Sequence, residues 1–386
     1  MTSTIDPKLQ GLVAFVRQLY GSDGFIPLHA PHFAGNEKKY LLDCIDSTFV
    51  SSVGAYVDRF EAMMRELTGA RYAIATVNGT AALHMALILA GVADGDEVIT
   101  QPLTFVATCN AISYQRALPV FIDVDRATLG LSTAALSEFL SEHAERRDDG
   151  CYNRSSGRRI RACVPMHTFG LPCEADALLR VCDEWGIVLI EDAAESLGSY
   201  IGDRHTGTIG HLGAFSFNGN KTVTCGGGGC IVTNDEGLGR LAKHLTTTAK
   251  QPHPWAFSHD TVGYNYRMPN LNAALACAQL EQLDDIIASK RDTAARYADF
   301  CVGHDVAFVG EPAGTRSNYW LNAVLLQDEA ERDAFLAYSN GAGVMTRPVW
   351  QLMPTLPAFS QAQCGPLSHA EWLAARLVNL PSSVRP

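Results

Sequence analysis

The stretch Gly213-Ala-Phe-Ser-Phe-Asn-Gly-Asn-Lys221 places one lysine directly after an apolar, strand-like segment. Four consecutive glycines, Gly226–Gly229, follow it and allow the chain to turn tightly. Upstream, the apolar run Ile187–Ile190 leads to Asp192. An amine on a glycine-rich loop can form a Schiff base with an aldehyde, and a carboxylate at a strand end can keep a pyridine nitrogen protonated. This pair predicts a pyridoxal 5'-phosphate (PLP) enzyme in which Lys221 and Asp192 are the catalytic residues.

Short apolar runs alternate with helical patterns through the first 250 residues. Runs that are apolar on both faces indicate a mostly parallel sheet covered by helices, so we predict the α/β class. The last two runs are close together in sequence, so one of them can be an antiparallel addition. The expected strands are 72–77, 97–100, 119–122, 162–166, 187–190, 214–217 and 229–233, with helices at 80–90 and 104–114.

The pattern changes near residue 250. A proline-bearing loop at 252–254 leads to a long predicted helix at 271–297, and the remainder mixes short strands and helices. We therefore expect a large PLP-binding α/β domain at 1–250 and a smaller C-terminal α+β domain at 251–386. Residues 140–160, rich in Arg, Asp and Ser, are expected to form an exposed loop.

Composition limits the classes of function. The chain has 386 residues, 47% hydrophobic and 18% charged, with a formal net charge of −11. This balance argues against nucleic-acid and anionic-membrane binding, which need a basic face. The N-terminus has no signal-peptide pattern, and the longest apolar stretch, Ala81–Val92, is too short to span a bilayer. The eleven cysteines form no CxxC pair, so we expect reduced thiols, a cytoplasmic protein and no metal site.

Two further segments carry groups suited to a phosphate. Asn78-Gly79-Thr80 joins a predicted strand to a helix start, where free N–H groups and the positive end of the helix can bind an anion. An ordinary strand–helix turn is the alternative at this point. Ser216 can donate its hydroxyl to the same phosphate. The order differs from a P-loop, because Lys221 precedes the glycines rather than following them.

The remaining residues are open to more than one interpretation. Asp192 can be a helix N-cap instead of the partner of the cofactor's pyridine nitrogen, although ligand sites in open α/β sheets lie at the carboxyl ends of strands. The adjacent Glu191 must point the other way. Phe105, in Pro102-Leu-Thr-Phe-Val-Ala-Thr108, can stack on a cofactor ring or belong to the core.

Taken together, these segments resemble the DegT/StrS family of PLP-dependent nucleotide-sugar aminotransferases. The resemblance covers about residues 27–384 and implies the aspartate-aminotransferase-like fold (fold type I), with a mostly parallel seven-stranded sheet. Several independent motifs in the right order carry it. They are Asn78-Gly-Thr-Ala-Ala-Leu83, Thr104-Phe-Val-Ala-Thr108, His167-Thr-Phe-Gly-Leu-Pro172, Glu191-Asp-Ala-Ala194, Ser216-Phe-Asn-Gly-Asn-Lys221, Gly263-Tyr-Asn-Tyr-Arg-Met268 and Thr346-Arg-Pro348.

Four segments resemble one branch of that family, whose members aminate C4 of UDP-2-acetamido-4-keto-2,6-dideoxyhexoses in bacillosamine and legionaminic acid pathways. They are Phe25-Ile-Pro-Leu-His-Ala-Pro-His-Phe33, Ser51-Ser-Val-Gly54, Phe217-Asn-Gly-Asn-Lys221 and Asn379-Leu-Pro-Ser-Ser383. The resemblance implies a UDP-linked keto sugar as substrate and glutamate as amino donor. Another nucleotide, dTDP or GDP, is the alternative.

Residue by residue, the resemblance implies roles for the matching positions. Gly79, Thr80 and Ser216 would hold the cofactor phosphate, Phe105 would cover the ring, and Lys221 would be the Schiff-base lysine and proton shuttle. Asn265 would reach the phosphate of the neighbouring subunit's cofactor, which implies a homodimer with shared active sites. The residues expected to face the substrate are His167, Arg267, Asn318, Tyr319 and Arg347. A core position is the alternative for His167, and a surface salt bridge is the alternative for Arg347.

Glu195 departs from many relatives, which carry Gln or His at this position to contact the phenolic oxygen of the cofactor. A carboxylate beside a phenolate is repulsive unless it is protonated or turned away. Two other functions are compatible with the fold: a PLP-dependent sugar dehydratase, against which the presence of Lys221 counts, and a non-catalytic regulatory or scaffold protein.

Overall fold

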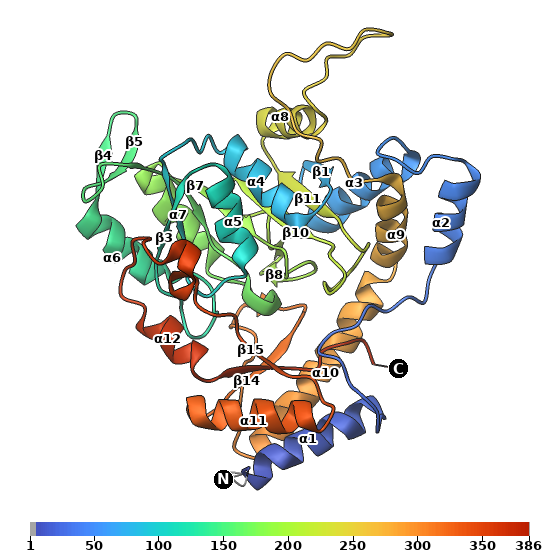
Figure 1. The fold of residues 1–386 in the computed structure, drawn as a ribbon, viewed down its shortest axis with the longest axis vertical. Coiled ribbons are helices and arrows are strands. Elements are labelled where there is room, and N and C mark those ends of the chain that lie inside the picture. The colour runs from blue at the N-terminus through green and yellow to red at the C-terminus, as the bar shows by residue number, and fades with distance from the viewer. Residues whose placement is uncertain (1–4, 386) are drawn as a thin grey trace.

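A nine-stranded mixed sheet forms the centre of the computed structural model, which describes residues 5–385 (Figure 1). Seven strands follow the order β1-β11-β10-β7-β6-β2-β3, and β4 and β5 are attached beside β6. Strands β10, β7, β6, β2 and β3 run parallel, whereas β11 is antiparallel to both of its neighbours. The bounds are β1 (Tyr72–Thr76), β2 (Glu97–Thr100), β3 (Leu118–Phe121), β4 (Ala144–Arg147), β5 (Gly150–Asn153), β6 (Arg159–Val164), β7 (Val188–Asp192), β10 (Leu212–Ser216) and β11 (Gly229–Thr233).

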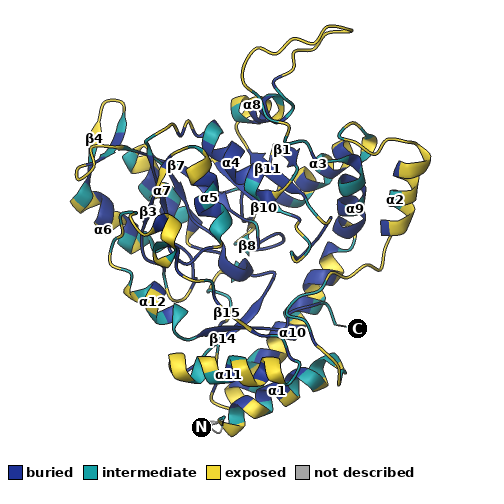
Figure 2. Cartoon of the chain, in the orientation of Figure 1, coloured by how far each residue is buried: buried dark blue, intermediate teal, exposed yellow. Residues whose placement is uncertain are grey.

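Helices cover this sheet, and its strands are buried while the outer helix faces are exposed (Figure 2). The apolar runs expected from the sequence are these buried strands, so the predicted α/β class and fold type I are confirmed. The helices of this part are α2 (Glu37–Asp46), α3 (Ala55–Thr68), α4 (Gly79–Leu89), α5 (Val106–Tyr114), α6 (Thr133–His143), α7 (Ala175–Trp185), α8 (Glu236–Thr246) and α9 (Asn270–Leu280).

A second, four-stranded antiparallel sheet lies in the C-terminal third, in the order β12-β14-β16-β15. A small three-stranded sheet, β13-β8-β9, joins this third to the large sheet's side of the molecule. The bounds are β8 (Tyr200–Ile201), β9 (Arg204–His205), β12 (Ala307–Phe308), β13 (Thr315–Arg316), β14 (Asn322–Leu325), β15 (Arg347–Pro348) and β16 (Leu377–Leu380), with helices α10 (Leu283–Gly303), α11 (Glu329–Gly341) and α12 (Ser368–Ala374).

The division at residue 250 stays a prediction, and two segments pack across it. Helix α1 (Pro7–Tyr20) contributes Leu9, Leu12 and Val16 to the same apolar cluster as Tyr297 of α10 and Val378 of β16. Helix α9 instead packs against α2 and α3. The N-terminal helix therefore shares its core with the C-terminal elements, and Figure 1 shows it beside α10.

Two local predictions were wrong. Residues 140–160 contain the antiparallel β4–β5 hairpin, in which Ala144 and Cys151 are buried while the charged residues Arg146 to Asp149 are exposed. The long helix expected at 271–297 is two helices, α9 and α10. The chain breaks at Gln282, whose side-chain amide donates to Glu37 Oε1 at 2.7 Å, so a tertiary contact accompanies the interruption.

Candidate active site

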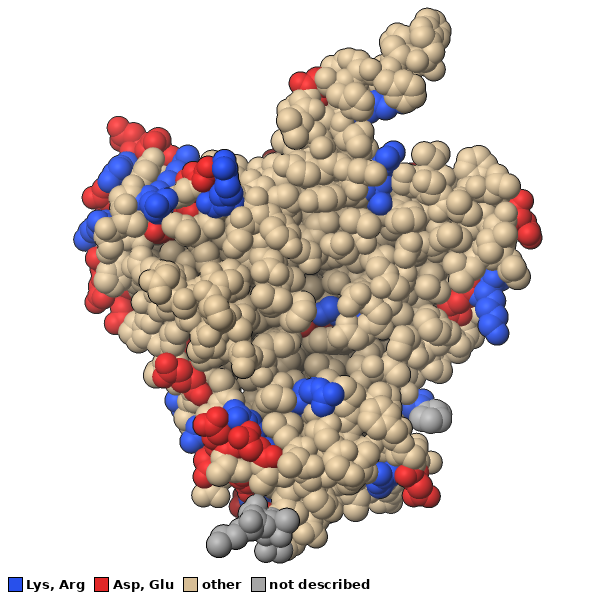
Figure 3. Space-filling model, in the orientation of Figure 1, with Lys and Arg blue, Asp and Glu red and all other residues tan. Residues whose placement is uncertain are grey.

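A cavity of about 300 Å³ opens at the carboxyl ends of the parallel strands, where ligand sites of open α/β sheets lie. On the face drawn in Figure 3, charged side chains gather mainly at the edges around a central hollow. Segments of the main sheet and of the C-terminal third of the chain both line the cavity, with Asn78, Gly79, Thr80, Leu83, Phe105, Ala107, Met166, Asp192, Ala194, Glu195, Ser216, Asn218, Asn220, Lys221, Trp320 and Trp350.

The start of α4 forms one end of the cavity. Asn78 caps the helix by accepting the N–H of Ala81 at 2.8 Å, which leaves Gly79 and Thr80 at the first turn facing the cavity. A Cβ on Gly79 would lie 2.7 Å from Cβ of Ser216, so only glycine allows the helix to approach the end of β10 this closely. Helix N–H groups beside a serine hydroxyl form a suitable phosphate cradle.

Asp192 lies at the end of β7 with only 2% of its surface exposed. Its Oδ2 accepts the hydroxyl hydrogen of Thr108 at 2.7 Å and its Oδ1 accepts the N–H of Ala194 at 3.2 Å. Burial raises the pKa of Asp192, against the lowering effect of these two bonds and of Lys221. A protonated ring nitrogen would give this carboxylate the positive partner that its buried position favours.

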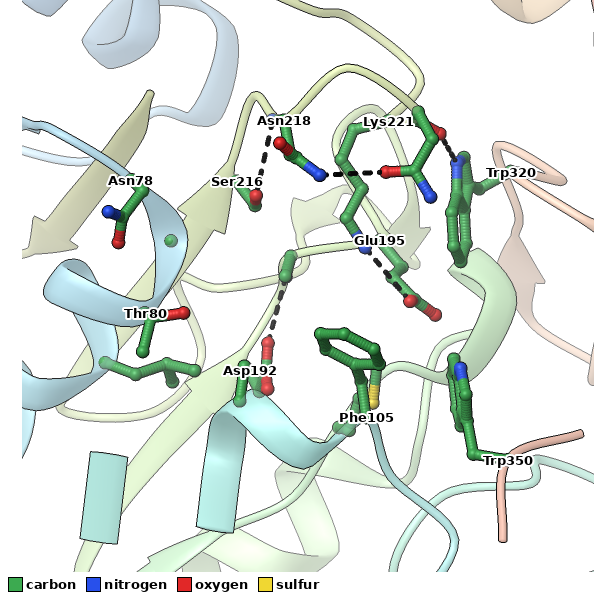
Figure 4. A pocket seen from close by; sticks show the side chains of 16 residues that line it. Asn78, Thr80, Phe105, Asp192, Glu195, Ser216, Asn218, Lys221, Trp320 and Trp350 are labelled. Atoms are coloured by element: carbon green, nitrogen blue, oxygen red, sulfur yellow. Dashed lines mark hydrogen bonds and ion pairs between the residues drawn. The ribbon is translucent and has the colours of Figure 1, made fainter. Parts of the chain in front are cut away.

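Lys221 reaches into the same cavity from the loop after β10 (Figure 4). Its Nζ lies 3.0 Å from Oε1 of Glu195, and the two side chains are 12% and 1% exposed. Burial raises the pKa of Glu195 to about 7, although the charge of Lys221 and the N–H of Phe169 act in the opposite direction. Glu195 therefore lines the cavity as expected, and its partner is the lysine.

Three aromatic side chains complete the walls. Phe105, 47% exposed, precedes α5, and Figure 4 shows its ring facing into the cavity. Its ring centroid lies 6.1 Å from that of Trp350. Trp320 places its ring 4.1 Å from Lys221 Nζ. These rings give the cavity apolar faces that can cover a flat heterocycle.

Three of the residues expected to face the substrate are buried outside the cavity lining. His167 has no exposed surface; its Nε2 lies 2.9 Å from Glu191, and its Nδ1 accepts the N–H of Cys173. Asn318, also fully buried, donates to two backbone carbonyls and to Thr222. Tyr319 is 8% exposed, and its hydroxyl accepts the N–H of Glu311. In this arrangement the polar groups of all three residues make hydrogen bonds within the protein and so have a structural role.

The structure also places Arg267, Arg347 and Asn265 away from this cavity. Arg267 lines a separate cavity of about 650 Å³ with Lys243 and Lys250. The Arg267 side chain donates to Asn265, which is exposed. Arg347 is exposed on β15 and donates to Asn340 at 3.0 Å.

Sequence reasoning missed the two cavity tryptophans and the role of Thr108. Thr108 stands inside the motif that contains Phe105, but its bond to Asp192 spans 84 positions. Trp320 directly follows Asn318 and Tyr319, and of these three residues Trp320 lines the cavity. Trp350 stands two residues after the Thr346-Arg-Pro348 motif. Only their spatial position distinguishes these tryptophans from core residues.

Comparison with known proteins agrees with this geometry. A sequence model of the DegT/DnrJ/EryC1/StrS aminotransferase family matches residues 31–385. The chain belongs to this family. A GDP-perosamine synthase of Vibrio cholerae is 37% identical over 367 residues, covering 92% of this chain and 94% of that protein. EpsN of Bacillus subtilis (strain 168), described as a candidate pyridoxal phosphate-dependent aminotransferase, is 37% identical, covering 87% of this chain and 84% of its own.

Among solved structures, the aminotransferase TlmJ from Streptoalloteichus hindustanus has a TM-score of 0.84 at 28% identity, covering 93% of this chain and 94% of its own. The chain is therefore an aminotransferase that uses PLP as its cofactor. The cavity fits that cofactor at both ends: a helix start whose Gly79 leaves room at Ser216, and a buried carboxylate at Asp192, with Lys221 between the walls.

No helix among residues 5–385 is both long and apolar enough to cross a membrane. Within the same described range, no group of three or more His, Cys, Asp or Glu side chains is arranged to hold a metal ion.

Proposed function

We propose that the enzyme transfers an amino group from glutamate to the keto carbon, C4, of a 6-deoxy sugar linked to a nucleoside diphosphate. The observation that carries the catalytic part is the meeting of Lys221 and Asp192 in one cavity with the helix start at Gly79. The substrate class rests on the family and on the names of its relatives.

PLP, when bound, supplies an aldehyde that accepts and releases amino groups and a protonated ring that stabilises negative charge. Asp192 would hold the proton on the ring nitrogen, with its carboxylate kept in place by Thr108 and Ala194. Gly79, Thr80 and Ser216 would bind the phosphate. Lys221 would anchor the cofactor and, once free, carry the proton from the donor's α-carbon to the cofactor and back to the sugar carbon.

The relatives favour a GDP-linked substrate over the UDP-linked one expected from the sequence. Two GDP-perosamine synthases, from Vibrio cholerae and Escherichia coli O157:H7, are 37% and 36% identical over more than nine-tenths of the chain. We therefore place GDP-linked 4-keto-6-deoxy sugars first among the candidate substrates. UDP- and dTDP-linked sugars are the alternatives.

A panel of GDP-, UDP- and dTDP-4-keto-6-deoxy sugars with glutamate tests this proposal, with mass spectrometry of the products. We expect the GDP sugar to give the highest kcat/KM, and a UDP or dTDP optimum would overturn the nucleotide assignment. Lys221→Ala should abolish turnover while leaving the circular dichroism spectrum unchanged. Borohydride should fix PLP to Lys221 in the wild type. A protein that remains colourless with added PLP would favour the scaffold alternative.

A homodimer with shared active sites is part of the proposal. The arm formed by residues 251–262 projects beyond α8 (Figure 1), and its Trp255 and Phe257 are 82% and 80% exposed. Large apolar side chains of this kind are typical of a contact surface. Exposed Asn265 stands just after the arm and lies outside its own subunit's cavity. A second copy of the chain can therefore receive Asn265 at its cofactor phosphate.

Mixing two inactive variants tests the shared site. If Asn265 acts across the interface, a hybrid dimer of Lys221→Ala and Asn265→Ala contains one intact site. Re-associated mixtures should then recover about a quarter of wild-type activity, as expected for random pairing. If Asn265 serves its own subunit, every hybrid site is damaged and no activity returns. Light scattering of the wild type gives the mass of the assembly independently.

A further inference from the structure

The amine of Lys221 has two partners that are themselves fixed by the protein. Oε1 of Glu195 lies 3.0 Å from Nζ, and the centroid of the Trp320 ring lies 4.1 Å from the same atom. Figure 4 shows both side chains beside the end of the lysine. An anion and an aromatic face each attract an ammonium group, and both effects strengthen where water is excluded.

Glu195 is held independently of the lysine. Its side chain is 1% exposed. Its second carboxylate oxygen, Oε2, accepts the N–H of Phe169 at 2.9 Å. The carboxylate therefore has a fixed direction, with one oxygen used by the backbone and the other turned toward Lys221.

Trp320 is fixed in the same way. Its indole N–H donates to the carbonyl of Asn220 at 2.7 Å, one residue before the lysine. Its own carbonyl accepts a hydrogen bond from Lys290 at 3.0 Å. The ring therefore has a set distance from the loop that carries the lysine.

A single buried side chain connects the two partners. The amide nitrogen of Asn318 donates to the backbone carbonyl of Glu195 at 2.9 Å, and its amide oxygen accepts the N–H of Trp320 at 2.8 Å. A Cβ on Gly170 would lie 1.8 Å from that amide oxygen, so the neighbouring glycine leaves the space that Asn318 occupies. Asn318 thus sets the spacing between the carboxylate and the aromatic ring.

We propose that Glu195 and Trp320 form a holding site for Lys221 in its ammonium form, when this lysine is not covalently joined to the cofactor and is not acting as the proton acceptor. Both are positioning residues, and Asn318 sets their separation. The contact is non-covalent: Nζ keeps its proton while held, and no bond or electron pair changes. The inference rests on the proposed role of Lys221 as the anchor of PLP.

Transamination gives such a holding site a purpose, because the lysine must leave the cofactor and return to it. An aminotransferase releases its lysine in the first half-reaction and must bring it back to the same atom at the end of the second. A free lysine chain has several rotatable bonds, and fixing it near its target reduces the entropy that each return costs. The neighbouring titratable groups are Glu195, Asp192 and His29. Because burial raises the pKa of Glu195 to about 7, the hold is weaker in acid than in mild alkali.

Labelling of Lys221 by acetic anhydride measures the hold directly, because only the unprotonated, unheld amine reacts. The enzyme is loaded with pyridoxamine 5'-phosphate, a form in which the lysine is free, and the Lys221 peptide is quantified by mass spectrometry at pH 8. Exposed Lys39 serves as the internal reference. We expect Glu195→Gln to raise the relative labelling rate by on the order of tenfold. Glu195→Asp should restore part of the protection.

Trp320 is tested with a matched pair. Trp320→Leu should raise labelling by about threefold, the scale of a cation–π contact, and Trp320→Phe should stay close to wild type. Trp350 lines the same cavity, so Trp350→Leu opens a similar space and should leave Lys221 labelling unchanged.

Unchanged labelling in Glu195→Gln would overturn the holding site, as would equal effects of Trp320→Leu and Trp350→Leu. A failure of the underlying assignment has a different signature. In that case borohydride reduction of the PLP enzyme would leave Lys221 unmodified, whatever the labelling shows.

Discussion

Replacing Glu195 with glutamine should stabilise the protein above neutral pH. Glu195 is buried, and burial raises its pKa from an ordinary 4.5 to about 7. Between these two values the folded chain retains a proton that the unfolded chain has lost. The wild type therefore loses stability as the pH rises from 4.5 to 7, and keeps that loss at higher pH. Glutamine has nearly the same shape and carries no charge at any of these pH values.

The expected magnitude follows from the two pKa values. Each pKa unit is worth about 1.4 kcal/mol, so ionising Glu195 in the folded protein costs about 3 kcal/mol more than in the unfolded chain. The attraction of Lys221 is already contained in this figure, since it lowers the pKa of Glu195 from a still higher value. At pH 5 the side chain at this position is largely neutral in both folded proteins, and their stabilities should differ by less than about 1 kcal/mol. At pH 8 the glutamine variant should be more stable by up to about 3 kcal/mol.

Urea unfolding at pH 5 and pH 8 measures this difference. The protein should be freed of PLP first, because a bound ligand adds its own contribution to stability. Glu66→Gln, at an exposed position of α3, is the matched control and should show the same small difference at both pH values. A Glu195→Gln effect that is equal at pH 5 and pH 8 would refute the reasoning. The same variant should lose the protection of Lys221, so stability and function would change in opposite directions.

Three further substitutions have defined outcomes. Burial lowers the pKa of Lys290 from 10.5 to about 7, so the unfolded chain binds the extra proton and wild-type stability rises with pH above 7. Relative to Lys290→Met, the wild type should therefore gain about 2 kcal/mol between pH 7 and pH 9 in urea unfolding, and a constant difference would contradict this. Gly79→Ala places a Cβ 2.7 Å from Ser216 Cβ, so the Kd for PLP should rise on the order of tenfold in a fluorescence titration, with an unchanged circular dichroism spectrum. An unaltered Kd would argue against the phosphate cradle. Asp192→Asn should lower kcat by on the order of a hundredfold while borohydride still fixes PLP to the lysine; near-normal turnover would exclude the proposed ring contact.

The large sheet was predictable because its strands are read from local sequence. Each parallel strand is an apolar run bounded by turns. Runs such as Ile187–Ile190 and Glu97–Thr100 can be recognised locally, whatever position the strand takes in the sheet. The β4–β5 hairpin was not predicted because exposed charged residues, among them Arg146 and Arg147, outnumber the buried Ala144 and Cys151 in this stretch, so it has no apolar pattern typical of a strand. The helix break at Gln282 is accompanied by a contact with Glu37, 245 positions away, which no local pattern contains.

The site shows the same contrast between residues that local motifs reveal and contacts that only the fold creates. Gly79, Thr80, Ser216 and Lys221 belong to short motifs whose chemistry is visible in the sequence, and all four line the cavity. Glu195 also lines the cavity, but its contact with Lys221 depends on how two loops meet. Sequence reasoning cannot assign a partner across such a junction, because the pairing is decided by the sheet that brings the loops together.

Asn318 explains why the substrate side was the hardest part to predict. A buried polar residue resembles a ligand-binding residue, since both must be satisfied by groups outside their own segment. Asn318 uses both ends of its amide inside the protein: its nitrogen donates to Glu195, Leu197 and Thr222, and its oxygen accepts the N–H of Trp320. The C-terminal third of the chain therefore contributes to the cavity through the ring of Trp320, which Asn318 positions, rather than through the Asn318 amide itself. A substitution at Asn318 should therefore raise the labelling rate of the Lys221 amine, although Asn318 makes no hydrogen bond with that lysine.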